Sequence, residues 1–206
     1  MVTQKELDKL NSQFKDKTPY EIIKMAFELN NEAVLTTNFR PYEAAILQAV
    51  SAVESKTPVV WCDTGYNTSQ TYKHAEQVIK ELDLNIFLYV PKQTSAHRDV
   101  VLGIPNVDAP EHTLFTEQVK LEPFKRAMNE HKPKVWFTNL RQGQTAFRDS
   151  IGIFSLSKDG VLKVSPFYYW SDADLDNYLI ENNLPNEFKY FDPTKALENR
   201  ECGLHT

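Results

Sequence analysis

The sequence predicts an α/β fold in which helices cover both faces of a mainly parallel, twisted sheet. Short apolar runs alternate along the chain with longer segments whose apolar residues recur at helical spacing. Because strands and helices alternate in this way, parallel pairing through right-handed crossovers is expected. Residues 58–62 form a continuous apolar run, which is typical of a parallel strand buried on both faces.

Two helices are expected within residues 1–30. The first covers residues 3–14, where leucine and phenylalanine side chains recur at helical spacing. The second begins after Thr18, which has the spacing of a capping box with Glu21 and is followed by proline at the first helical position.

Strands and helices then alternate along the rest of the chain. We expect strands at residues 33–37, 58–62, 85–90 and 135–138, and helices at 69–82, 122–131 and 171–182, with a further helix that opens at Pro41. A hairpin turned at Asp159-Gly160 joins residues 152–157 to residues 162–166. Prolines interrupt residues 91–120, for which we expect a long loop with at most one short helix. Residues 183–206 are expected to form a mobile tail, and residues 1–206 together are expected to form a single domain.

Composition limits the classes of function. The chain has 206 residues, 41% hydrophobic and 25% charged, and a net charge of −5. Apolar runs fall well short of the ~20 residues that span a membrane, and the first residues lack the apolar region of a signal peptide. We therefore expect a cytoplasmic protein without a membrane or nucleic-acid partner, and any anionic ligand needs a local positive pocket.

The two cysteines, Cys62 and Cys202, are too few for a metal or iron–sulfur site made of cysteine alone. The five histidines show no metal-ligand spacing, so no metal site is expected. Cys62 lies in an apolar run and is interpreted as packed, whereas Cys202 lies in the polar tail and is interpreted as exposed. A disulfide between them is an alternative that a reducing compartment disfavours.

Polar side chains follow three predicted strands, at the edge where open α/β sheets bind ligands. The first loop leads into a helix, and its hydroxyl and amide groups are suited to an anion cradle, although the pattern alone favours capping of that helix. The second loop offers a carboxylate for a ribose or adenine group, or a capped turn. The third offers two arginines that match phosphate or sulfate oxygens, or a solvated basic loop. The candidate residues are Thr36, Thr37, Asn38 and Phe39, then Asp63 and Thr64, then Arg141, Gln144, Thr145 and Arg148.

The tail ends in a cysteine with charged neighbours. Arg200 lies two residues before Cys202 and His205 three residues after it. Such neighbours lower the pKa of a thiol and favour a nucleophile, while an incidental terminal cysteine is the alternative. Glycine-rich dinucleotide and phosphate loops, zinc-protease and esterase motifs are missing, so those enzyme classes lack support.

Four segments taken together resemble the phosphoadenosine phosphosulfate reductase family, in family order. Residues 61–66, W-C-D-T-G-Y, resemble its D-T-G-Y/H loop, and residues 135–145, V-W-F-T-N-L-R-Q-G-Q-T, resemble its W-F-x-G-L-R-R-x-Q-S stretch. Residues 162–170, L-K-V-S-P-F-Y-Y-W, resemble K-V-x-P-x-x-x-W. Residues 200–205, R-E-C-G-L-H, are nearly identical to the family's K/R-E-C-G-L/I-H ending.

The resemblance implies an adenine-nucleotide α-hydrolase-like fold that binds 3′-phosphoadenosine-5′-phosphosulfate (PAPS) at the strand ends. Cys202 would attack the sulfate sulfur and become S-sulfocysteine, from which reduced thioredoxin or glutaredoxin would release sulfite in sulfate assimilation. Adenosine and phosphosulfate would lie on the first two loops, anionic groups on the third, and the departing phosphate or the sulfate near His205. Related adenosine phosphosulfate reductases carry a four-iron cluster on paired cysteines, which this chain lacks, so the cluster-free type without a cofactor is implied. A homodimer is a family-level expectation.

Two departures from the family pattern leave three functions open. The family's first loop reads S-x-F-G-x-[QE], whereas residues 38–43 here read N-F-R-P-Y-E. When the two phenylalanines are aligned, this loop has no glycine and has one extra residue before the glutamate. The family also carries a longer segment, with H-P-x-x-x-x-G-Y-x-S-x-G-D, where residues 184–199 here number 16. We therefore weigh an active PAPS reductase against a nucleotide-binding relative acting as a sensor, and against a same-fold enzyme for another sulfur or nucleotide substrate.

Overall fold

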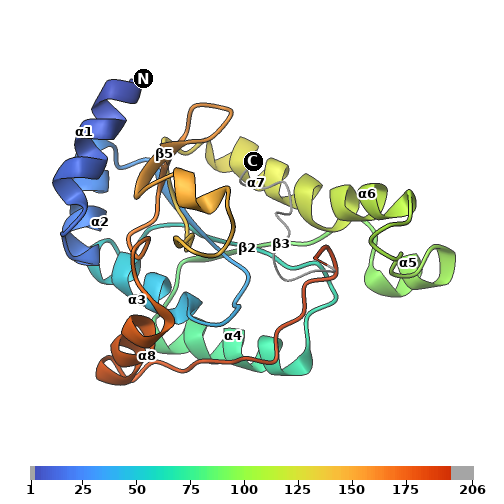
Figure 1. Ribbon diagram of the computed structural model, residues 1–206. Helices are drawn as coiled ribbons and strands as arrows, with labels where there is room; N and C mark the ends of the chain where they lie inside the picture. Colours follow the sequence, from blue (N-terminus) through green and yellow to red (C-terminus); the bar gives the residue numbers. More distant parts are fainter. Residues whose placement is uncertain (1–2, 196–206) are drawn as a thin grey trace.

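The computed structural model describes residues 3–195, which surround one six-stranded sheet (Figure 1). The strand order is β3-β2-β1-β4-β6-β5, with β5 antiparallel to β6 and all other neighbours parallel. The strands are β1 Ala33–Thr37, β2 Val59–Cys62, β3 Ile86–Tyr89, β4 Val135–Phe137, β5 Phe154–Leu156 and β6 Leu162–Val164. The predicted mainly parallel sheet and its terminal hairpin are confirmed.

Helices lie on both faces of the sheet, as predicted. They are α1 Gln4–Phe14, α2 Pro19–Leu29, α3 Glu43–Val53, α4 Ser69–Glu81, α5 Ser95–Val101, α6 Glu111–Thr116, α7 Glu122–His131 and α8 Asp172–Glu181. The predicted capping boxes at Thr18 and Ser171 are both present. Within residues 3–195, none of the helices is long and apolar enough to cross a membrane.

The two faces of the sheet are covered unequally. Figure 1 shows α4 on one side of the strands and α7 on the other. The main core lies on the α4 side, where Leu35, Val59 and Phe137 pack against α2, α3, α4 and α8. On the α7 side, Val60 packs in a small cluster around Ala127. Strand β2 is therefore buried on both faces, as its continuous apolar run predicts.

The structure corrects the long loop expected at residues 91–120. That segment holds α5, α6 and a π-helical turn, Glu117–Leu121, which runs directly into α7. Prolines punctuate these helices without breaking them, because Pro110 stands at the N-cap of α6. Helix α5 begins where the Thr94 hydroxyl accepts a hydrogen bond from the His97 amide.

The π-helical turn is explained by the proline that follows it. Pro123 has no amide hydrogen and crowds the carbonyl four residues earlier, so a regular helix cannot continue through it. The wider turn absorbs this mismatch, and the Glu122 amide donates to the Glu117 carbonyl five residues back. The turn brings Lys120, which is 6% exposed, toward the strand ends.

Strand order also fixes where a ligand can bind. The chain leaves β1 through α3 on one face to reach β2, and it enters β4 through α7 on the other face. The crossovers therefore diverge between β1 and β4, and this reversal opens a crevice beyond the carboxyl ends of these strands. The predicted first and third loops follow these two strands.

Candidate functional site

A pocket lies in the crevice between the ends of β1 and β4. Its walls come from β1 and its loop, the end of β2, the π-helical turn and the loop after β4, and it has a volume of about 80 Å³. Thr36, Lys120, Trp136 and Arg148 are among its lining side chains. A wider groove of about 820 Å³ lies near the opposite ends of β4 and β6, beside α1, and contains none of the predicted site residues.

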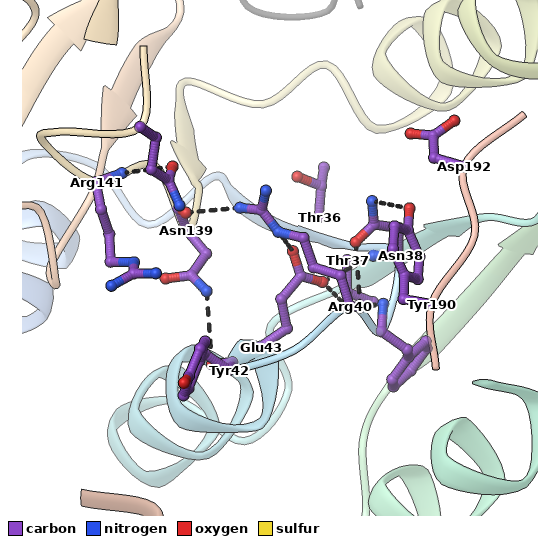
Figure 2. Close-up of polar contacts among 12 residues, drawn as sticks. Thr36, Thr37, Asn38, Arg40, Tyr42, Glu43, Asn139, Arg141, Tyr190 and Asp192 are labelled. Carbon is purple, nitrogen blue, oxygen red and sulfur yellow. Dashed lines mark hydrogen bonds and ion pairs between the residues drawn. The ribbon is translucent and has the colours of Figure 1, made fainter. Parts of the chain in front are cut away.

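The first loop is organised around an internal carboxylate (Figure 2). Glu43, in the first turn of α3, is 5% exposed and accepts hydrogen bonds from the Thr37 hydroxyl at 2.6 Å and the Asn38 amide at 2.8 Å. Arg40 forms an ion pair with the same carboxylate, with Nε 3.0 Å from Oε1. In this structure, two donors of the predicted anion cradle thus bind the protein's own glutamate.

Arg40 also ties the first loop to the loop after β4. The Arg40 Nη2 atom donates a hydrogen bond to the backbone carbonyl of Asn139 at 2.8 Å (Figure 2). The side-chain Nδ2 atom of Asn139 lies 3.5 Å from the backbone carbonyl oxygen of Tyr42. The helix predicted to open at Pro41 begins two residues later, because Tyr42 has a left-handed φ of 69°. Arg40 is therefore a bridge between two strand ends.

The other two residues of the first loop have different surroundings. The Thr36 hydroxyl lines the pocket and accepts a hydrogen bond from Trp136 Nε1 at 2.9 Å. Phe39 is 1% exposed, and its ring packs against Trp61 at a centroid distance of 4.9 Å. In this structure, Thr36 is available at the pocket, whereas the Phe39 side chain belongs to the core.

The second loop is shaped by Asp63. This carboxylate accepts hydrogen bonds from the Gly65 amide at 2.9 Å, from Asn67 Nδ2 at 2.8 Å and from the Tyr72 hydroxyl at 3.0 Å. Thr64 is buried, and its hydroxyl accepts from the amide of Tyr66 at 3.3 Å. Neither Asp63 nor Thr64 lines the pocket between β1 and β4.

The third loop sends its two arginines in different directions. Arg148 is 4% exposed, lines the pocket and donates to Gln144 Oε1. The Thr145 hydroxyl accepts from the Arg148 amide at 3.3 Å. Arg141 Nη2 instead lies 2.6 Å from Asp172 Oδ1 at the start of α8, so the structure brings Arg148 to the pocket and keeps Arg141 outside it.

Several charged residues of the site were not among the predicted site residues. Those that line the pocket are Arg40, Glu43, Lys120 and Lys195, and Asp192 pairs with Lys120. Lys120 lies in the segment that was expected to be a loop, and Asp192 lies in the predicted tail. The Lys120 ammonium forms an ion pair with the Asp192 carboxylate, and both side chains are more than nine-tenths buried. A lysine between helical segments has no distinctive pattern, so only the spatial pairing across 72 residues reveals it.

Burial and charge set the ionisation of two groups near the pocket. Burial raises the pKa of Asp192, but the Lys120 charge and the hydrogen bonds from Lys120 and Thr194 outweigh it and leave the pKa below its ordinary value. Burial raises the pKa of Cys62, which also lines the pocket, to about 12. Asp192 is therefore an anion at neutral pH, and Cys62 is a neutral thiol.

The predicted nucleophile Cys202 and its neighbour His205 lie outside the described residues. Among residues 3–195, no three histidine, cysteine or acidic side chains are close enough together to hold a metal ion. Cys62 is a free thiol. The described part of the site therefore offers cations, hydroxyls and amides to a ligand, beside the buried carboxylate of Glu43 and the thiol of Cys62.

A protein-family model described as the phosphoadenosine phosphosulfate reductase domain matches residues 32–191. The chain belongs to this family. Among curated relatives, the phosphoadenosine 5′-phosphosulfate reductase of Synechococcus is 30% identical over 87% of this chain and 78% of its own length. That of Shewanella oneidensis is 31% identical over 99% of this chain and 93% of its own length. The latter alignment spans 231 positions against 206 residues here, so this relative carries residues without a counterpart in the shorter chain.

Solved structures agree on the fold. The phosphate complex of PAPS reductase from Candida auris superposes with a TM-score of 0.80 at 23% identity, over 90% of both chains. An FMN adenylyltransferase from Candida glabrata superposes with a TM-score of 0.54 at 12% identity, over 86% of this chain and 64% of the other. The chain therefore has the adenine-nucleotide α-hydrolase-like fold that the sequence resemblance implies.

Proposed function

We propose that this member of the PAPS reductase family is a cytoplasmic enzyme that reduces PAPS to sulfite and adenosine 3′,5′-bisphosphate in sulfate assimilation. The observation that carries the proposal is the pair of buried cations, Lys120 and Arg148, which line one pocket beyond the carboxyl ends of parallel strands. In a chain with a net charge of −5, such a local concentration of positive charge suits a phosphosulfate.

Cys202 is the nucleophile in this proposal. Its thiolate attacks the sulfur of the sulfate group, a sulfur–sulfur bond forms, and the bond from that sulfur to the bridging phosphate oxygen breaks. Adenosine 3′,5′-bisphosphate leaves, and Cys202 carries an S-sulfo group. The high pKa of Cys62, about 12, supports this choice, because less than a thousandth of its thiol is ionised at neutral pH.

A protein dithiol supplies the electrons. One thiolate of reduced thioredoxin or glutaredoxin attacks the sulfur of Cys202, and sulfite departs with the electron pair of the broken sulfur–sulfur bond. The second thiol then resolves the mixed disulfide and restores the Cys202 thiol. Two electrons pass from the dithiol to the sulfur of the sulfate, and no further cofactor is needed.

The deciding experiment measures sulfite released from PAPS by the full chain with reduced thioredoxin. We expect turnover by the natural chain, and none by Cys202→Ser. PAPS should raise the melting temperature of both proteins, because the pocket does not depend on the thiol. Stabilisation without sulfite release would replace the proposal with a nucleotide-binding sensor. Absence of binding by PAPS and by adenosine 3′,5′-bisphosphate would favour another sulfur or nucleotide substrate.

A further inference from the structure

Residues 186–195, called the strap below, run across the strand ends. The strap begins where the Asn186 side-chain oxygen accepts a hydrogen bond from the Tyr42 amide at 2.9 Å. Further along, the Tyr190 hydroxyl lies 2.7 Å from the side-chain amide group of Asn38 (Figure 2). The first part of the predicted mobile tail is therefore held against the loop that follows β1.

The start of α4 provides an independent anchor for the strap. The Thr68 hydroxyl donates to the Lys189 carbonyl at 2.7 Å, and the Thr71 hydroxyl approaches the same carbonyl at 3.3 Å. These contacts involve neutral side chains outside the pocket. They therefore hold the first half of the strap whatever happens at its charged end.

The end of the strap forms an ion pair with Lys120, one of the cations that line the pocket. Asp192 forms the buried ion pair with Lys120 and accepts hydrogen bonds from the Thr194 amide at 3.0 Å and the Thr194 hydroxyl at 2.6 Å. Lys120 Nζ also donates to the Thr194 hydroxyl at 3.2 Å. A carboxylate of the protein itself thus neutralises a cation that the proposed function assigns to the substrate.

The remaining free space is too small for a nucleotide. The pocket volume is about 80 Å³, whereas sites for drug-sized ligands usually have roughly 300–1,000 Å³. Some of the lining has to move before PAPS enters. Asp192 is the acidic group of the strap that lies on Lys120, and an incoming phosphate or sulfate would seek the same ammonium group.

We propose that Asp192 is an affinity-determining residue, whose carboxylate competes with the anionic groups of the substrate for Lys120. The identity of the ligand rests on the proposed function, but the competition does not. Because the pKa of Asp192 is held below its ordinary value, the competitor is fully charged at neutral pH. Linkage requires the effect to be mutual, so ligand binding loosens the end of the strap and a looser strap binds ligand more tightly.

The test is the affinity of the full-length Asp192→Asn variant, measured by calorimetry with adenosine 3′,5′-bisphosphate and separately with inorganic sulfate. Asparagine keeps the shape of the side chain and its bonds to Thr194 but removes the charge. We expect the dissociation constant of both probes to fall about tenfold. Glu117→Gln is the matched control. Glu117 lies in the same π-helical turn as Lys120 but forms an exposed ion pair with Lys125, so this substitution removes the same charge away from the pocket and should leave both dissociation constants unchanged.

An unchanged or weaker affinity of Asp192→Asn would overturn the inference, as would failure of both proteins to bind either probe. Hydrogen exchange of residues 188–195 gives a second readout that a purely structural role would not move. Exchange of the natural strap should accelerate when ligand binds, and ligand-induced protection would contradict the competition. Sulfite release from PAPS is measured separately and tests the proposed reductase function. A tenfold gain in affinity of Asp192→Asn without sulfite release would support the competition at Lys120 and contradict the reductase function. Sulfite release with unchanged affinity would support the reductase function and contradict the competition.

Discussion

Cys62 lies at the pocket but is expected to be unreactive. Burial raises the pKa of its thiol from 9.0 to about 12, which lowers its thiolate fraction about a thousandfold. We expect iodoacetamide at pH 8 to leave Cys62 largely unmodified while Cys202 is alkylated, as measured by mass spectrometry of the digested protein. Unfolding in urea should make the two thiols react alike. Rapid alkylation of Cys62 in the folded protein would contradict this ionisation.

The two arginines of the third loop should separate in function. Arg148 lines the pocket, so Arg148→Ala should weaken binding of adenosine 3′,5′-bisphosphate by about 1.5–3 kcal/mol, the range for a charge-assisted hydrogen bond. Arg141 pairs with Asp172 outside the pocket, so Arg141→Ala should lower the free energy of unfolding by up to about 1 kcal/mol and leave affinity intact. Calorimetry and urea denaturation of both variants check the contrast, which equal losses of affinity would refute.

Candidate residues could be named from the sequence where the signal is local in the chain. Thr36, at the end of one predicted strand, and Arg148, in the loop after another, were both named from the sequence, and both line the pocket. Lys120 and Asp192 were missed because each becomes significant only through a partner 72 positions away. Glu43 was missed as a ligand of the first loop because a glutamate in the first turn of a helix is a common stabilising feature.

Helix α1 protects the antiparallel edge of the sheet. Asn11 Nδ2 donates to the Phe154 carbonyl at 2.8 Å, and Asn11 Oδ1 accepts from the Phe154 amide at 2.9 Å, so one side chain satisfies both polar groups of an edge-strand residue. Asn11→Ala should therefore lower the free energy of unfolding by about 1–3 kcal/mol, measured by urea denaturation. The control is Ser12→Ala, at an exposed neighbouring position. An equal loss of unfolding free energy in both variants would show that the two Asn11–Phe154 hydrogen bonds do not stabilise the fold.

Elements with strong periodicity were predicted, and elements separated by prolines were not. The helices at Thr18 and Ser171 combine capping boxes with apolar spacing, so local signals and packing agree. Helices α5 and α6 have six or seven residues, too few to establish a helical period, and their prolines suggested a loop. The π-helical turn could not be foreseen, because its extra width becomes visible only in hydrogen bonds around Pro123.

The strap contributes to stability in a way that pH should reveal. Because the folded protein holds the pKa of Asp192 below its unfolded value of about 3.9, the ion pair stabilises fully above that value and is lost as pH falls through the folded pKa. Asp192→Asn should lower the free energy of unfolding by about 3 kcal/mol at pH 7. The difference from the natural chain should be constant from about pH 5 to 8 and shrink below about pH 4. Denaturation series at each pH test this, and a difference that varies between pH 6 and 8 would contradict it.

At the scale of the whole molecule, the order of the strands was beyond local reasoning. Neighbours β1, β2 and β3 follow one another in the chain, but β1 also pairs with β4, where Ala33 lies beside Val135. Closing a loop of about a hundred residues carries a larger entropy cost than the short crossovers before it, so we expect β4 to join a preformed β1–β3 unit during folding. The pocket lies where β1 pairs with β4, the contact that is expected to form last, so ligand binding should be among the last properties to return on refolding. A chain truncated before β4 would keep three strands and half of the pocket wall, but no site.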